Sequence, residues 1–127
     1  MRYITPQELL VIHARIVDAT GGAHGVRDVG LLLSLCERPK TSFGGKQMYP
    51  SVFAKAGVLC ESLATYHVFV DGNKRTALAA ATRFLHVNGY ILHATNADAV
   101  KIILGVATKK LDISGITNWL KTHSREH

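Results

Sequence analysis

The chain has 127 residues, of which 47% are hydrophobic and 19% are charged, a balance typical of a folded globular protein and not of a disordered tail. Fifteen lysines and arginines against nine acidic residues give a net charge of +6, which favours an anionic partner such as a nucleotide, a nucleic acid or an acidic protein. Basic residues are not interleaved with aromatic ones in any run, so we expect no direct binding of nucleic acid.

The cysteines and the N-terminus indicate a cellular compartment. Cys36 and Cys60 stand alone in apolar surroundings without a CxxC motif, which predicts buried free thiols in a reducing environment. The N-terminus lacks the apolar core of a signal peptide, and no apolar stretch is long enough to span a bilayer. We therefore expect a cytoplasmic protein without membrane contact.

The first third of the chain predicts two helices. Thr5-Pro6-Gln7-Glu8 has the pattern of a capping box with Thr5 as the N-cap, and Gly21-Gly22 is expected to end this first helix. Asp28 can cap a second helix that runs as far as Pro39. The apolar residues that recur at helical spacing in the first helix are Leu9, Ile12, Ile16 and Ala19.

The segment 41–50 is glycine-rich, carries two aromatic residues and is long for a connection inside so small a protein. Such loops are usually functional or mobile, and Gly44-Gly45 at its centre predicts a short β-hairpin. From Ser51 the apolar pattern returns to a helical period and keeps it up to residue 66.

The second half of the chain predicts three more helices. An alanine-rich helix is expected from Thr76 to about Val87, with Gly89 as its left-handed cap, and its alanines allow close helix packing at the centre of the protein. Asn96 and Ser114 are expected to cap the two helices that follow. No repeat or linker divides the chain, so we predict a single domain over residues 1–127 with a compact all-α architecture and a small hairpin.

The most informative stretch is the nine residues 67–75, with the sequence His-Val-Phe-Val-Asp-Gly-Asn-Lys-Arg. His67 follows the helix from Ser51, and a histidine there is a natural general base for a hydroxyl because imidazoles titrate near physiological pH. The alternative for a lone histidine is a hydrogen-bonded residue at a helix end, but the carboxylate, glycine and cations beside it favour the catalytic interpretation. Phe69 is expected to fill the core and fix the loop.

Asp71 has two interpretations that the sequence leaves open. Its carboxylate can be the N-cap of the following helix, where it would accept backbone N–H groups. It can equally be a ligand for Mg²⁺, which is usually bound through one or two carboxylates together with nucleotide phosphates.

The last four residues of the stretch suit a phosphate. Gly72 can adopt positive φ and present successive N–H groups, and such a nest at a helix N-terminus binds phosphate. Asn73 can donate its amide to a phosphoryl oxygen or cap the helix. Lys74 supplies a point charge and Arg75 a planar fork for phosphate oxygens; both oppose the helix dipole unless an anion is present. Transfer of a phosphorus-containing group to a hydroxyl is therefore expected.

This stretch resembles the signature of the Fic/Doc family, and its ending Asn-Lys-Arg resembles the Doc (death-on-curing) branch. Fic proteins typically carry HPFxxGNGR, whereas this chain has valine at position 68 and lysine at position 74. Further similarity covers nearly the whole chain, and the matching landmarks are Gly25-Val26-Arg27-Asp28, Leu31-Leu32, Arg38-Pro39, Tyr49-Pro50, Thr76-Ala77-Leu78, Phe84-Leu85 and Asn88-Gly89. The resemblance implies a Fic/Doc-like helical bundle with a small β-hairpin flap.

The resemblance also implies roles for individual residues. His67 would be the general base, and Asp71 would bind Mg²⁺ or orient the catalytic site. The four residues 72–75 would hold the phosphates of ATP: Gly72, Asn73, Lys74 and Arg75. The flap would dock the target segment by strand-like pairing through Phe43, Gly44, Gly45, Lys46, Gln47 and Met48.

At the level of function, the resemblance implies the toxin of a toxin–antitoxin pair. A Doc-type protein kinase would transfer the γ-phosphate of ATP to a threonine of elongation factor Tu and arrest translation, and an antitoxin would cover the active-site groove. Two alternatives stay open: a Fic-type adenylyltransferase, which transfers AMP to a protein hydroxyl, and a catalytically idle partner of an antitoxin. Replacement of the family's glycine by Lys74 adds bulk and charge, which we expect to favour γ-phosphate transfer.

The C-terminus contains a partial match to the inhibitory motif [S/T]xxxE[G/N] of self-inhibited Fic enzymes. Thr122 and Glu126 have the required spacing, but His127 replaces the final glycine or asparagine, and Glu126 lies one residue from a chain end that is expected to fray. We therefore expect restraint by a separate antitoxin and not by this segment.

Overall fold

The computed structural model describes all 127 residues, and helices dominate it. The six α-helices are α1 (Pro6–Thr20), α2 (Val29–Glu37), α3 (Val52–Thr65), α4 (Asn73–Val87), α5 (Asn96–Ala107) and α6 (Ile113–Thr122), and a single 3₁₀ turn spans Arg38–Lys40. The strands form two antiparallel pairs, β1 (Ser42–Phe43) with β2 (Lys46–Gln47) and β3 (Tyr90–Leu92) with β4 (Ser124–Glu126). The predicted all-α architecture with a small hairpin is confirmed.

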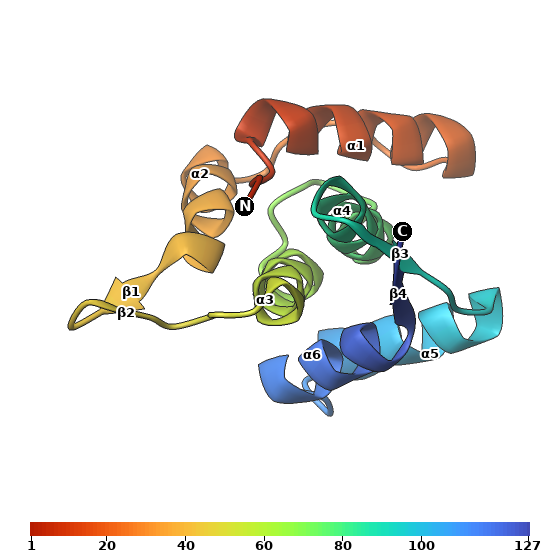
Figure 1. The fold of residues 1–127 in the computed structure, drawn as a ribbon. Helices are drawn as coiled ribbons and strands as arrows, with labels where there is room; N and C mark the ends of the chain where they lie inside the picture. Colours follow the sequence, from red (N-terminus) through yellow and green to blue (C-terminus); the bar gives the residue numbers. More distant parts are fainter.

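Helices α3 and α4 lie side by side at the centre of the molecule. In Figure 1 they are seen nearly end-on, with α1 and α2 on one side and with α5 and α6 on the other. The α3–α4 contact is the most extensive in the protein, followed by that of α3 with α6. Ala77, Ala80 and Ala81 of α4 are fully buried, so the alanine-rich helix occupies the predicted central position.

Two of the four N-cap residues predicted from the sequence are the caps in the structure, and two are not. Thr5 and Asp28 cap α1 and α2 as predicted, since each side-chain oxygen accepts a backbone N–H of the first turn. The predicted caps of the last two helices are wrong by one and two residues: Thr95 caps α5 and Asp112 caps α6. Each of these two residues is also a good cap and precedes the predicted one.

Two further expectations need correction. Helix α4 begins at Asn73 instead of Thr76, so the end of the nine-residue stretch is helical and not part of the loop. The apolar stripe of α1 is also shifted, because Leu9, His13 and Val17 are its buried residues.

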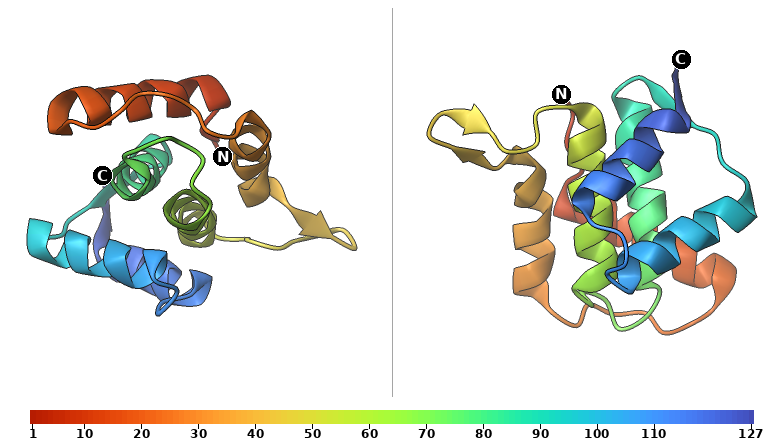
Figure 2. Two further views of the ribbon diagram at one scale, coloured as in Figure 1. Left: turned by 180° about the vertical axis from the view of Figure 1, so that it is seen from behind. Right: turned by 90° about the horizontal axis from the view of Figure 1, so that it is seen from below.

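The second two-stranded sheet is a feature that the sequence did not predict. Strand β4 pairs with β3 so that Glu126 lies opposite Tyr90, and the backbone N–H of His127 donates to the carbonyl of Gly89 (3.1 Å). Figure 2 (right) shows the C-terminus at the end of the bundle opposite the loop that joins α3 to α4. No helix of the protein has both the length and the apolar character needed to cross a membrane.

Candidate active site

His67 stands immediately after α3 in a left-handed backbone conformation. The helix ends at Thr65 with Tyr66 as its C-cap, and His67 then has a φ of 48°, one of only two non-glycine residues with positive φ. This conformation costs about 1 kcal/mol for a residue with a side chain, although histidine tolerates it better than most. The side chain of His67 is exposed to solvent.

The next two residues fix the loop to the rest of the protein. Val68 and Phe69 are fully buried, which confirms that Phe69 fills the core. The carbonyl of Val68 accepts the backbone N–H groups of Arg27 and Asp28 (2.8 and 3.2 Å), and Val26 forms an antiparallel bridge with Phe69. The loop from α1 to α2 therefore supports the loop that carries His67.

Asn73 closes the loop with its side chain. Its Oδ1 accepts the backbone N–H of Phe69 and its Nδ2 donates to the carbonyl of Phe69, both at 2.9 Å. The N-cap of α4 is Gly72, so neither Asn73 nor Asp71 caps the helix. One Nδ2 proton of Asn73 is left for another acceptor, because a primary amide carries two.

The Asp71 carboxylate lies between two backbone donors. Oδ1 accepts the N–H of Gly72 (3.0 Å) and Oδ2 accepts the N–H of Ala23 (3.3 Å), while the residue stays exposed. A Cβ on Gly22 would lie 2.7 Å from Oδ2, so a glycine there makes room for the carboxylate. No group of three or more potential metal-ligating side chains occurs. A single exposed carboxylate fits Mg²⁺, which is typically held by one or two carboxylates plus phosphates and water.

The N-terminus of α4 is open to an anion. It is the only α-helix of the six whose N-cap supplies no side-chain acceptor, because Gly72 occupies that position with a φ of 74°. Lys74 and Arg75 in its first turn are exposed and form no salt bridge; Arg75 Nη1 donates only to Thr20 Oγ1 (3.2 Å). Free N–H groups, the helix dipole and two unpaired cations together favour binding of a phosphate.

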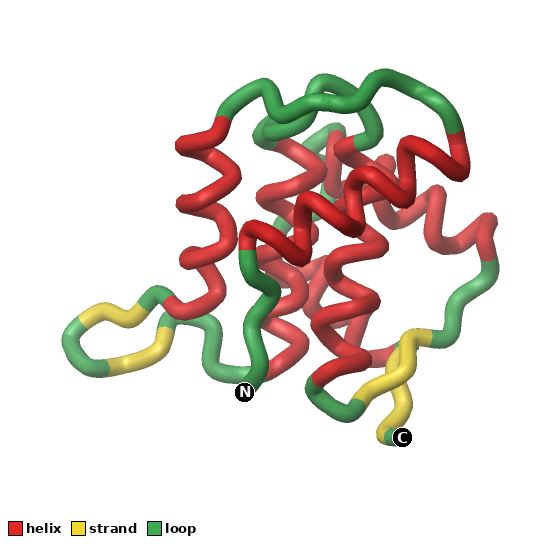
Figure 3. The backbone as a smooth tube through the Cα atoms, turned by 90° about the horizontal axis from the view of Figure 1, so that it is seen from above, coloured by secondary structure: helices red, strands yellow, loops and turns green.

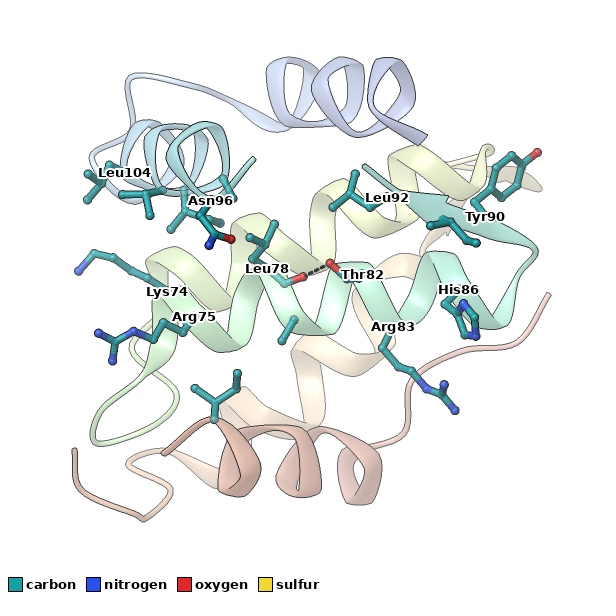
Figure 4. Close-up of a pocket in the computed structure, with 16 residues that line it drawn as sticks. Lys74, Arg75, Leu78, Thr82, Arg83, His86, Tyr90, Leu92, Asn96 and Leu104 are labelled. Carbon is teal, nitrogen blue, oxygen red and sulfur yellow. Dashed lines mark hydrogen bonds between the residues drawn. The ribbon is translucent and has the colours of Figure 1, made fainter. Parts of the chain in front are cut away.

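A groove of about 820 Å³ extends from these cations along α4. In Figure 4, Lys74 and Arg75 project from the N-terminal end of α4, whereas Arg83 and His86 lie near its other end. Ten of the 16 lining residues are hydrophobic, and they come mainly from α4, β3 and α5. The groove is thus apolar in the middle and cationic at both ends.

The predicted flap is present but lies away from His67. Strands β1 and β2 pair Ser42 with Gln47 and Phe43 with Lys46, and all the predicted flap residues, Phe43 to Met48, are exposed. Figure 3 shows the hairpin projecting from one side of the bundle, on the side away from the C-terminus. Since α3 starts just after the hairpin and ends just before His67, its 14 residues separate the two by roughly 20 Å.

A buried lysine anchors this flap to α3. Lys55 is only 2% exposed, and its Nζ donates to Gln47 Oε1 (2.6 Å) and to the carbonyl of Tyr49. Burial lowers the pKa of Lys55 below its ordinary value. The hydrogen bonds offset part of the cost of burying this charge and fix the second strand of the flap.

Taken together, the structure brings His67, Asp71 and residues 72–75 to one end of the molecule, in a helical protein with a loop suited to bind anions. Residues 3–85 match the model of the Fic/DOC family. The chain is 45% identical over 100 residues to "Toxin Doc" of Mycolicibacterium smegmatis, which covers 77% of each protein. It is 28% identical over 121 residues to "Protein kinase doc" of Escherichia phage P1, covering 95% of this chain and 94% of that protein. The chain belongs to the Fic/Doc family.

Proposed function

We propose that this protein is the toxin of a toxin–antitoxin pair and an ATP-dependent protein kinase. The observation that carries the proposal is the uncapped N-terminus of α4, where the exposed Lys74 and Arg75 have no carboxylate partner. Cations in the first turn of a helix are unfavourable without an anion, and the phosphates of ATP supply one. Similarity to a protein named as a toxin and to one named as a protein kinase supports the same conclusion.

In this proposal each residue has a role that follows from its position. His67 accepts the proton of the target hydroxyl, whose oxygen then bonds to the γ-phosphorus while the bond from that phosphorus to the β–γ bridging oxygen breaks and ADP leaves. Gly72, Asn73, Lys74 and Arg75 bind and orient the phosphates. Asp71 would hold Mg²⁺, which neutralises phosphate charge when bound.

Lys74 supports γ-phosphate transfer over AMP transfer. The residue is helical and exposed, and its side chain lies beside Arg75 at the end of the groove nearest the start of α4, as Figure 4 shows. A glycine at this position would leave the backbone N–H groups of the first turn accessible from that side. The added bulk and charge are expected to prevent the α-phosphate from taking the position that adenylyl transfer requires.

We further propose that an antitoxin segment covers the groove between α4 and α5. Val100 and Leu104 of α5 line this groove and are 60% and 48% exposed, and Ile91 of β3 adds to the apolar surface. Exposed apolar side chains that gather in one groove are typical of a binding surface. A segment bound there would pass beside Lys74 and Arg75 and would block access of ATP to the phosphate site.

The proposed target is a threonine of elongation factor Tu, whose phosphorylation would arrest translation in the cytoplasm. The test incubates purified elongation factor Tu with the protein and with ATP labelled at the α- or the γ-phosphate, followed by mass spectrometry of the product. We expect γ-label and a mass increase of one phosphate on threonine, and no labelling with His67→Ala. Retained α-label would instead establish an adenylyltransferase, and growth arrest by His67→Ala in cells would establish toxicity without catalysis.

A further inference from the structure

A histidine occupies a core position of α1. His13 is 3% exposed and lies one turn from the buried residues Leu9 and Val17 on the same helix face. A polar ring in a packed core is unfavourable unless its polar atoms are hydrogen-bonded. Its one side-chain hydrogen bond therefore indicates why a histidine, and not a leucine, fills this place.

His13 bonds to the backbone of the catalytic loop, 58 residues away in the sequence. Its Nε2 lies 2.8 Å from the carbonyl oxygen of Asp71. A carbonyl oxygen only accepts hydrogen bonds, so Nε2 carries the proton and donates it. The bond thus fixes both the orientation of the ring and the position of its Nε2 proton.

The ring also packs against the residues on either side of this bond. It stacks on Phe69 with ring centroids 3.8 Å apart and an angle of 6° between the planes. Nε2 lies 3.8 Å from the point where a Cβ of Gly72 would be. His13 therefore contacts the loop at Phe69 and Asp71, and its ring occupies the space next to Gly72.

We propose that His13 is a positioning residue for phosphate binding. Because a peptide group is planar, holding the carbonyl of Asp71 also sets the direction of the N–H of Gly72 on the opposite side of the same peptide, which itself donates to Asp71 Oδ1 (3.0 Å). Glycine allows this peptide to rotate easily, and rotation would turn a carbonyl oxygen toward the phosphate site, where it would repel the anion. The proton on Nε2 keeps the N-terminus of α4 in its anion-binding form.

The inference rests on the proposed function for its catalytic readout, but its structural readout is independent. In His13→Phe the stacked ring is kept and the donor is lost, whereas His13→Gln keeps an N–H donor without the ring. His13→Leu is a second donor-free variant in case the larger ring of phenylalanine impairs folding. His93→Phe is the control, since His93 is exposed and lies outside the catalytic loop.

Three quantities are measured on each variant: hydrogen exchange of the Gly72 amide, the affinity for ATP and the rate of phosphate transfer. We expect His13→Phe and His13→Leu to speed exchange and to weaken both ATP binding and transfer by roughly tenfold to a hundredfold, because a shift of about 1 Å in a positioning group has such an effect. His13→Gln should recover a large part of the slow exchange, of the ATP affinity and of the transfer rate. His93→Phe should match the wild type in all three.

Unchanged exchange at Gly72 in both donor-free variants would overturn the proposal, and so would the absence of any recovery in His13→Gln when that variant is folded. Failure of the proposed function looks different. The wild type would then transfer no phosphate at all, while the exchange of the Gly72 amide would still respond to loss of the donor.

Discussion

Asn73 and His67 show how single residues of the catalytic stretch are held. Asn73 uses both polar atoms of its side chain on the backbone of Phe69, so it shapes the loop before any substrate binds. His67 accepts a left-handed conformation whose cost of about 1 kcal/mol the bonded loop around it must offset. Order in the loop therefore comes from the Asn73 bonds to the backbone together with the backbone bonds to residues 25–28, and the side chain of His67 stays exposed.

The two buried cysteines give a second prediction about single residues, which concerns the dependence of stability on pH. Burial, with a smaller contribution from the adjacent Glu61, raises the pKa of the Cys60 thiol to about 12, and burial raises that of Cys36 to about 11, from 9.0. Above pH 9 the unfolded chain releases thiol protons that the folded chain keeps. Stability is therefore fully present below pH 9 and is lost as the pH rises toward 11 and 12.

The matching experiment measures the free energy of unfolding by urea between pH 9 and 10.5. Each buried thiol is expected to contribute a fall of up to about 1.4 kcal/mol per pH unit. Cys60→Ala is less stable overall but should show a shallower fall by about this amount. If the free energy of unfolding falls equally steeply with pH in Cys60→Ala and in the wild type, the pKa of Cys60 is not raised by burial.

At the scale of elements, two neighbouring glycines follow the end of α1, and only the second of them, Gly22, lies against Asp71. Gly21 and Gly22 both have positive φ, 86° and 104°, but a Cβ on Gly21 would meet open space whereas one on Gly22 would meet the Asp71 carboxylate. Gly21→Ala and Gly22→Ala should each lower the free energy of unfolding by about 1–2 kcal/mol. Only Gly22→Ala should also lower the rate of phosphate transfer, by roughly tenfold.

This pair of variants separates backbone strain from displacement of a functional side chain. Thermal or urea unfolding measures the loss of stability from backbone strain, and the transfer assay measures the effect of displacing Asp71. If Gly21→Ala slows transfer as much as Gly22→Ala does, the effect comes from strain at the end of α1 and not from contact with Asp71.

Local signals predicted most elements, and long-range contacts account for what they missed. Thr5 and Asp28 cap the expected helices, the helix expected from Ser51 is α3, and Gly44-Gly45 form the expected hairpin turn. The part of the candidate site contained in residues 67–75 was equally local, so its members could be named from the sequence. His13 could not, since its partner Asp71 is distant in the chain; a histidine inside the apolar stripe of α1 was the one available signal.

The strand β4 was missed for the same reason. Ser124–Glu126 has no apolar alternation, and its pairing partner β3 lies more than 30 residues earlier. The start of α4 was placed late because glycine and polar residues at positions 72–75 are typical of a loop. The structure continues the helix through the last three of them.

For the molecule as a whole, the position of the C-terminus supports the expectation that residues 122–127 do not inhibit the site. Glu126 lies in β4 beside the C-terminal end of α4, whereas Lys74 and Arg75 lie at the start of this 15-residue helix, roughly 20 Å away. Removal of residues 124–127 should therefore not raise the transfer rate. It should lower the melting temperature, because the β3–β4 backbone bonds are lost.

Both quantities can be measured on the same purified truncated protein, with a chain lacking only His127 as the control. A transfer rate several times that of the wild type would show that the C-terminal segment does restrain the enzyme. An unchanged melting temperature would show that the second sheet contributes little to stability.

The separation of the flap from His67 sets a length requirement on any protein that uses both. An extended chain advances about 3.3 Å per residue, so about six residues are needed to span the 14-residue helix α3. A target whose strand pairs with the flap must therefore carry its acceptor hydroxyl at least that many positions away, or on another part of its folded surface. Recognition would then be bipartite, and short peptides around the modified residue would be poor substrates.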